Sequence, residues 1–336
     1  MASKPKLGVG IDIGGFSIKL VELTFDKQDK PTLTNVGTCQ LKGEGQSSVR
    51  DGLKELLNAA KISTNEVNIS LSGPSVVVRY IQIPKMTDEE LKGAIRFEAE
   101  KYIPFNINDV ILDFQSLASS QEDAKKMCVL LVAAKKDLVE SKIALLQEVG
   151  LAPKIIDIDS FCVVNSFIFS NPGIDKNKDT AILDIGSVFS EINIIRGNEP
   201  HFTRSIQIAG RDITSTISEN LKLDIKSASE VKHNLQEGQD DVFEHMKPIL
   251  FELVSEIRLS FSYYENQFGS AVDQVYITGG SAKLSRLPEF LTENLGVKTQ
   301  RWDPLGPIMM GPNVKREVIE NMRDQLATSV GLALRG

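Results

Sequence analysis

The sequence predicts an α/β chain built from two similar lobes, with a smaller α/β segment inserted into the first lobe. Its 336 residues exceed the size at which a single hydrophobic core usually keeps growing, so two cores are expected. An apolar strand, an Asp-Ile-Gly turn and a second apolar strand occupy residues 7–24, and the same order returns at residues 180–195. Strand-like and helix-like apolar patterns follow each other in both halves, which is typical of mixed α/β domains.

Composition and charge narrow the class of protein. With 41% hydrophobic and 25% charged residues the chain resembles an ordinary globular protein, and its net charge of −7 disfavours binding to bulk nucleic acid. Cys39, Cys128 and Cys162 form no Cys-x-x-Cys pair, so free thiols are expected. The N-terminal residues lack the apolar region of a secretory signal, and no stretch approaches the roughly 18 apolar residues that span a bilayer. We therefore expect a soluble, cytoplasmic protein.

The first half is expected to begin with a β-hairpin. Strands are predicted at Leu7–Ile13 and Ser17–Thr24, where Val, Ile and Leu are frequent, and Gly14-Gly15 supplies the turn. The remaining predicted elements of this half are a helix at Val49–Lys61 and strands at Val67–Leu71 and Val76–Ile83.

Residues 84–156 are expected to form the inserted segment. Thr87 and Glu90 make a capping-box pattern, in which a hydroxyl and a carboxylate bond the first free amides of a helix. That helix is predicted to run to Tyr102, before Pro104. The other predicted elements are strands at Val110–Leu117, Met127–Ala134 and Pro153–Ile158 and a helix at Lys136–Val149.

The second half is expected to repeat the hairpin and to add helices. Strands are predicted at Thr180–Ile185 and Glu191–Ile195, around a turn that contains Gly186. A strand at Gln274–Thr278 leads into Gly279-Gly280. The predicted helices are Phe161–Phe169, Arg211–Leu221, Ala228–Leu235, Asp241–Phe268 and Ala327–Leu334.

The first Asp-Ile-Gly turn carries the residue types that a nucleoside triphosphate requires. Its glycines allow close backbone approach to phosphate oxygens, and Lys19 shares a strand face with the hydroxyl of Ser17, where a cation would neutralise phosphate. Asp12 suits Mg²⁺ held through water. The candidate binding residues of this turn are Asp12, Gly14, Gly15, Phe16, Ser17 and Lys19. A single turn of this kind also occurs as a purely structural hairpin.

Two later segments have a matching character. Asp184, Gly186 and Ser187 form the second turn, in which Asp184 is a second candidate for Mg²⁺ through water, and Glu191 follows at the same distance that separates Asp12 from Lys19. Glu191 could orient a water molecule. The third segment is glycine-rich and would let an adenine ring lie close to the backbone, although an ordinary strand-to-helix turn has the same pattern. Its candidate residues are Gly279, Gly280, Ser281 and Leu284.

These three segments resemble the two phosphate motifs and the adenosine motif of the actin, Hsp70 and sugar-kinase superfamily. The resemblance implies two RNase H-like lobes with ATP and Mg²⁺ between them. Asp157–Asn165 and Thr328–Arg335 resemble the two connecting helices of that fold. By the same resemblance Lys232 and Gly210 would border the nucleotide, and Asp159 joins Glu191 as a candidate for positioning the attacking water.

Further segments resemble the PilM family of type IV pilus assembly proteins, in the FtsA-like branch of this superfamily. They are Ile83–Leu91, Glu98–Phe105, Leu253–Tyr264 and Gly331–Arg335. The expected fold is therefore an actin-like ATPase fold with an FtsA-like insertion. The expected subdomains are 1A (1–83, 157–178 and 326–336), 1C (84–156), 2A (179–212 and 271–325) and 2B (213–270).

The family resemblance implies a cytoplasmic ATP-binding adaptor at the inner face of the inner membrane. Its partner would be the cytoplasmic N-terminal tail of PilN, contacted through Met86, Leu91 and Ile95, and it would link pilus motor ATPases to the alignment complex. Hydrolysis of ATP is expected to be slow or absent. A sugar or acyl kinase of the same fold and a filament-forming FtsA-like protein, which would self-associate, are the alternatives; the Cys-rich zinc motif of related sugar kinases is missing from the sequence.

Overall fold

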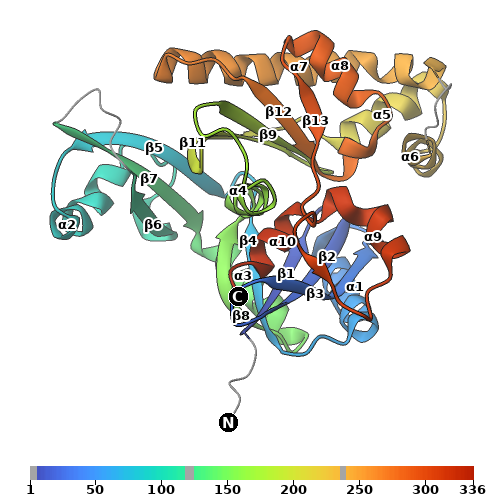
Figure 1. Ribbon diagram of the computed structural model, residues 1–336, viewed down its shortest axis with the longest axis horizontal. Helices are drawn as coiled ribbons and strands as arrows, with labels where there is room; N and C mark the ends of the chain where they lie inside the picture. The colour runs from blue at the N-terminus through green and yellow to red at the C-terminus, as the bar shows by residue number, and fades with distance from the viewer. Residues whose placement is uncertain (1–5, 118–124, 235–239) are drawn as a thin grey trace. The chain divides into compact units, whose positions relative to one another are not determined.

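The computed structural model describes residues 6–117, 125–234 and 240–336 (Figure 1). Contacts divide the chain into two compact units. The first, here called the core unit, comprises Met1–Ser70 and Leu151–Gly336, and the second, the inserted unit, comprises Leu71–Gly150. Within the described ranges, no helix combines the length and apolar character needed to cross a membrane.

The first sheet of the core unit contains the predicted N-terminal hairpin. In spatial order its strands are β14 (Met309–Met310), β3 (Pro31–Gln40), β2 (Ser17–Phe25), β1 (Lys6–Ile13), β4 (Glu66–Leu71) and β8 (Ala152–Ile158). Strands β1 and β2 are antiparallel, with Asp12 directly opposite Lys19. Helix α1 (Gly45–Ala60) contacts β2 and β3. Because the central strands are buried along most of their length, they carry continuous apolar runs rather than strict alternation.

The second sheet of the core unit contains the predicted repeat of the hairpin. Its strands are, in spatial order, β11 (Glu199–Ile206), β10 (Ser190–Arg196), β9 (Asp179–Ile185), β12 (Gln274–Thr278) and β13 (Thr299–Arg301). Asp184 lies opposite Glu191 in the antiparallel β9–β10 pair. The associated helices are α5 (Gly210–Leu221), α6 (Ile225–His233), α7 (Asp240–Phe268) and α8 (Leu287–Leu295). Apolar residues of α5, α7 and α8 share one hydrophobic core with this sheet.

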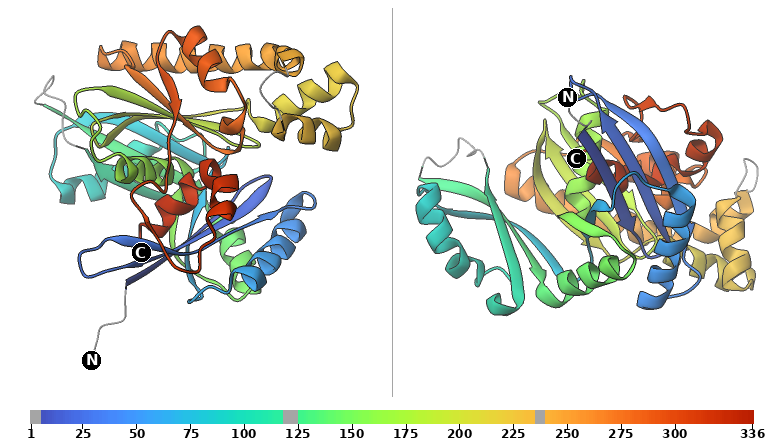
Figure 2. Two further views of the ribbon diagram at one scale, coloured as in Figure 1. Left: turned by 45° about the vertical axis from the view of Figure 1, so that its right-hand side comes forward. Right: turned by 90° about the horizontal axis from the view of Figure 1, so that it is seen from below.

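Two helices connect the sheets of the core unit. Helix α4 (Asp159–Ser170) contacts β9 and β10, and helix α10 (Ala327–Ala333) contacts β1, β2 and α4. In Figure 2 the red C-terminal helix lies against the blue N-terminal hairpin. Glycine makes this approach possible: a Cβ on Gly10 would overlap Ser329 O, and a Cβ on Gly331 would overlap Cys162 O. Both predicted connecting helices are therefore present and touch each other.

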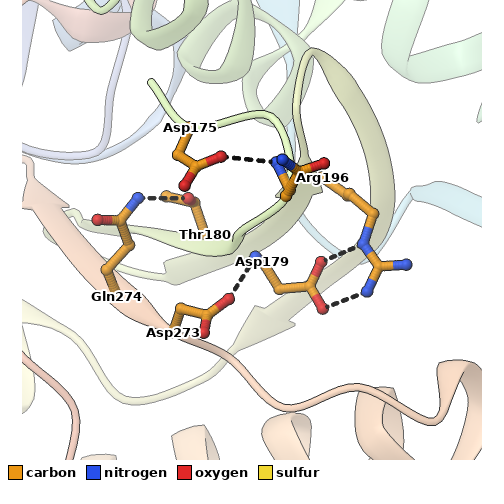
Figure 3. A network of polar contacts seen from close by, with 7 residues as sticks. Asp175, Asp179, Thr180, Arg196, Asp273 and Gln274 are labelled. Carbon is orange, nitrogen blue, oxygen red and sulfur yellow. Dashed lines mark hydrogen bonds and ion pairs between the residues drawn. The ribbon is translucent and has the colours of Figure 1, made fainter. Parts of the chain in front are cut away.

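An ion pair between a buried carboxylate and an exposed arginine fixes the start of β9, at the end of the strand away from Asp184. The carboxylate of Asp179, which is fully buried, accepts two hydrogen bonds from Arg196, at 2.7 and 2.9 Å (Figure 3). Asp273 accepts from the Asp179 amide at 2.8 Å, and Gln274 donates to Thr180 at 2.9 Å. These bonds join β9, β10 and β12 and fix their register, so the ends that carry Asp184, Glu191 and Gly279 are aligned as well.

The inserted unit is a three-stranded sheet with two helices. Its strands are β5 (Val76–Pro84), β7 (Lys126–Lys135) and β6 (Val110–Ser116), and its helices are α2 (Asp88–Ala99) and α3 (Lys136–Glu148). The predicted capping box is present, because Thr87 accepts from the Glu90 amide and Glu90 accepts from the Thr87 amide, at 3.2 and 2.8 Å. Helix α2 ends at Ala99, before the predicted end at Tyr102, since the amides of Lys101 and Tyr102 bond carbonyls only three residues back.

Two strands lie in different sheets from those expected. Val76–Pro84, assigned by sequence to the first subdomain, pairs with β7 in the inserted unit. Ala152–Ile158, assigned to the insert, joins the first sheet of the core unit. Both borders of the inserted unit therefore lie closer to the N-terminus than residues 84 and 156. The division of the remaining chain into 1A, 2A and 2B stays a prediction, and the predicted end of α6 at Leu235 lies outside the described residues.

Gly331→Ala should destabilise the chain, because the added methyl group overlaps a backbone oxygen that cannot move away by a change of rotamer. We expect the free energy of unfolding to fall by about 2 kcal/mol or more, measured by chemical denaturation. Gly173→Ala is the matched control, since a Cβ there meets no atom within 4 Å. Equal stability of the two variants would contradict the proposed close packing of α10 on α4.

Candidate functional site

The β1–β2 turn brings together the residues of the first predicted motif. Lys19 Nζ donates to Asp12 Oδ2 at 3.0 Å, and the two side chains are only 14% and 11% exposed. The Gly14 amide donates to Ser17 O at 3.2 Å and closes the turn. A Cβ on Gly14 would lie 2.9 Å from Lys19 Nζ, so a larger residue would displace the lysine from this position.

The β9–β10 turn is braced by the first residues of α5. The Gly186 amide donates to Phe189 O at 3.2 Å within the turn. Gly186 O and Ser187 O in turn accept from the amides of Gly210 and Arg211, both at 2.9 Å. The turn therefore has a fixed backbone even though its side chains are only partly buried.

The third predicted segment lies directly against the second turn. Gly279 has a φ of 93°, and a Cβ at this position would overlap the Asp184 carboxylate and Ile185 O. Its amide donates to Asp324 O at 2.7 Å. Only glycine tolerates both this positive φ and the close contact with Asp184 and Ile185. This explains why the third segment has glycine at position 279.

Lys232 and Gly210 meet beside Ser281. Lys232 Nζ donates to Gly210 O at 2.8 Å, and a Cβ on Gly210 would lie 2.7 Å from Ser281 Oγ. Burial lowers the pKa of Lys232 to about 8, because the charged ammonium loses most of its hydration. This lysine retains donor capacity beyond its one backbone partner.

The first and second turns touch each other. A Cβ on Gly15 would overlap the Val188 side chain. Burial raises the pKa of Asp184 to about 7; the Asp12 carboxylate raises it further, and Lys19 counteracts this rise. Asp12, Asp184 and Lys19 therefore act on one another electrostatically, although they come from opposite halves of the chain.

Glu191 is held by a residue that sequence reasoning missed. Ser160 Oγ, on the first turn of α4, donates to Glu191 Oε2 at 2.6 Å. Burial raises the pKa of Glu191 to about 7, the Ser160 hydrogen bond lowers it, and Asp159 raises it again. Both predicted candidates for positioning water, Glu191 and Asp159, are thus near each other. Ser160 had no signal of its own beyond its place next to Asp159.

The residues present suit phosphate and a hydrated divalent cation. A Cβ on Gly15 would collide with Val188 and one on Gly279 with Asp184, so these glycines let the segments lie close together. Lys19 bonds Asp12 and also acts electrostatically on Asp184. A cation would relieve the mutual repulsion of the two carboxylates. No group of three or more His, Cys, Asp or Glu residues in the described chain could hold a metal directly. Asp12 and Asp184 are a donor set that fits Mg²⁺, which usually keeps several water ligands and binds through one or two carboxylates.

The structure does not gather every predicted residue in this site. Leu284 is 5% exposed and packs in the core of the second sheet, while the Phe16 ring lies on the outside against His233. The predicted partner-binding residues belong to the inserted unit: Leu91 and Ile95 are buried in its core, and Met86 packs at the edge of that core. Their role in binding a partner stays a prediction.

Comparison with known proteins identifies similar chains. The family model of Type IV pilus assembly protein PilM matches residues 10–336. A solved PilM-PilN type IV pilus biogenesis complex matches with 29% identity and a TM-score of 0.86 over 98% of each chain. MreB5 of Spiroplasma citri bound to ADP matches at 11% identity with a TM-score of 0.53, over 97% of this chain and 94% of that one. Cell division protein FtsA of Streptococcus pneumoniae is 21% identical, covering 88% of this chain and 75% of FtsA.

These matches confirm the predicted fold class. The chain has an actin-like ATPase fold with two lobes of mixed α/β structure. Its similarity to FtsA, which the sequence predicts, is also confirmed.

Glu191→Gln should make stability less dependent on pH. The raised pKa of Glu191 means that the folded chain favours the protonated carboxyl; this contribution is present below the unfolded value, near 4.5, and is lost as pH rises through about 7. Glutamine stays neutral, so the variant should gain about 1–3 kcal/mol relative to the parent between about pH 5 and about pH 8. Chemical denaturation across this range measures the difference, and a difference independent of pH would contradict the assignment.

Proposed function

Because the chain belongs to the PilM family of type IV pilus assembly proteins, we propose that it is an ATP-binding adaptor of pilus assembly. In this role it binds the cytoplasmic N-terminal tail of the inner-membrane protein PilN. It links the pilus motor to the alignment complex and is held at the inner face of the inner membrane through its partners. Self-association and contact with motor ATPases are further parts of this proposal.

The observation that supports nucleotide binding is the meeting of the two turns. Asp12 with Lys19, and Asp184 next to Gly279, come from opposite halves of the chain and influence each other's charge. Asp12 and Asp184 would hold Mg²⁺ through water, and Lys19 would neutralise phosphate. Bound Mg²⁺ would supply charge neutralisation for the phosphate groups.

The remaining contacts support the proposed position of the nucleoside. The backbone at Gly279 and Gly280 offers a flat approach for adenine, and Lys232 has free donor capacity beside Gly210 and Ser281. MreB5, which shares this fold, was solved with ADP. This likeness supports nucleotide binding, and the position of the nucleotide and the residue roles are part of the proposal.

Hydrolysis would depend on how a water molecule is positioned. Glu191, fixed by Ser160, and the neighbouring Asp159 are the candidates for this role. A carboxyl with a pKa of about 7 is partly ionised at neutral pH and is basic enough to accept a proton from an attacking water molecule. Glu191→Ala should therefore reduce any hydrolysis and leave nucleotide binding intact.

The partner assignment is supported by the PilM-PilN complex, whose PilM-family fold covers 98% of this chain at 29% identity. A short tail that binds in extended form needs apolar contacts and free backbone partners. In the inserted unit, Leu91 and Ile95 are committed to the core, whereas Met86 is half-buried at its edge. Among the three predicted residues, Met86 is therefore the one best placed for direct contact.

Calorimetric titration with Mg-ATP tests the nucleotide site. Wild-type protein should bind, and Asp12→Ala should bind at least about tenfold more weakly, because it removes a metal-holding carboxylate and leaves Lys19 unpaired. Asp51→Ala is the control, since Asp51 is exposed on α1. Unchanged affinity in Asp12→Ala would place the nucleotide elsewhere.

A second titration, with a peptide that copies the PilN N-terminal tail, tests the partner. Met86→Asp should weaken peptide binding about tenfold, because a desolvated carboxylate opposes an apolar contact. Lys92→Ala, on the exposed side of α2, should bind like the wild type. Absence of peptide binding to the wild type, with Mg-ATP binding retained, would overturn the adaptor role while leaving the nucleotide site in place.

A further inference from the structure

Four side chains bridge the two lobes of the core unit at the outer edge of the phosphate turns. They are Phe16 and Glu44 from the first lobe and Arg211 and His233 from the second, here called the interlobe clasp. None of the roles assigned above uses Glu44, Arg211 or His233. Each half of the clasp contacts the first phosphate turn, through either the Gly15 carbonyl or the Phe16 ring.

The aromatic half of the clasp stacks Phe16 on His233. The ring centroids are 6.0 Å apart and the planes differ by 17°, although the Phe16 side chain is 39% exposed. The imidazole is oriented by a 2.7 Å contact between its Nδ1 and Ser229 O. His233 directly follows Lys232, whose ammonium bonds Gly210 O, so the stack is tied to the nucleoside side of the site.

The ionic half of the clasp is built on Arg211. Its guanidinium lies 2.9 Å from Glu44 Oε1 and donates to Gly15 O at 3.3 Å. The Arg211 amide meanwhile donates to Ser187 O in the second turn. One residue therefore contacts both phosphate turns, by its side chain on the first and by its backbone on the second.

The geometry points to a gating role: we propose that the interlobe clasp holds the two phosphate turns together without nucleotide and must open before nucleotide enters or leaves. The residues of the clasp are positioning residues, since the contacts described are with one another and with the turns. The inference rests on the proposed nucleotide site. It adds that the rates at which nucleotide enters and leaves the site are set by contacts between protein side chains at the outer edge of the phosphate turns.

The strength of the contacts fits a gate rather than a permanent lock. Ion pairs as exposed as Arg211 with Glu44, and partly exposed ring stacks, are individually weak. A clasp made of two such contacts can open often while remaining closed most of the time. In this proposal the same contacts form again once nucleotide is inside, so their loss should accelerate entry and exit together.

Stopped-flow kinetics with a fluorescent ATP analogue and Mg²⁺ tests this gate. Arg211→Ala and His233→Ala should each raise the association and dissociation rates by about fivefold, with the dissociation constant nearly unchanged. His233→Phe keeps a ring for Phe16 and should restore the slow rates. Arg204→Ala removes an arginine pair with Glu256 that lies wholly in the second lobe, and it should leave both rates unaltered. A rise in dissociation alone would mark direct ligand contacts and overturn the gate.

Hydrogen exchange without nucleotide gives an independent measurement. In Arg211→Ala the amides of residues 14–17 and 186–189 should exchange faster than in the wild type, whereas in Arg204→Ala they should not. Unchanged exchange in Arg211→Ala would overturn the clasp even if the protein binds ATP. The wild type could fail to bind ATP while the amides of both turns still exchange faster in Arg211→Ala than in the wild type. In that case the clasp stands as a contact between lobes and the proposed nucleotide role fails.

Discussion

The close packing of α10 on β1 and α4 is the constraint on which the site depends. Gly8 and Gly10 leave room for the backbone of α10 on the first strand, and Gly331 leaves room for the backbone of α4. This packing ties the end of the chain to its beginning and places α4, with Ser160 and Asp159, between the two sheets. Asp12 and Asp184 lie at the ends of strands held by this packing. The distance between the two carboxylates is therefore determined by helix packing that lies outside their own turns.

The site gathers charge that the fold itself does not need. Burial raises the pKa values of Asp184 and Glu191 to about 7 and lowers that of Lys232 to about 8. Each shift means that the charged form of the group is less favourable in the folded chain than in water. The free energy of unfolding at neutral pH is lower for this reason. The Asp179–Arg196 pair is different, because two direct hydrogen bonds compensate its buried carboxylate. Uncompensated charge is thus concentrated where phosphate and a cation would offset it.

The paired turns and most helices could be predicted from the sequence, because their signals are local. Capping at Thr87, glycine turns and long apolar runs depend on neighbouring residues. Strand β11 was missed because Pro200, His201 and Arg204 interrupt its apolar pattern. The borders expected for the inserted segment differ from the structure at β5 and β8, since the pairing of a strand is decided by tertiary contacts. For the same reason Ser160 and the Arg211 contacts could not be foreseen, as nothing in the local pattern shows which side chains meet across the lobes.

The most direct test of the nucleotide site is a crystal structure of the protein with Mg²⁺ and a non-hydrolysable ATP analogue. The triphosphate should lie between the Asp12–Lys19 turn and the Asp184–Ser187 turn, with adenine against the backbone of Gly279 and Gly280. Mg²⁺ should contact Asp12 and Asp184 through water. A nucleotide bound elsewhere, or these turns unchanged and empty at saturating ligand, would contradict the assignment and leave the paired turns as structural hairpins.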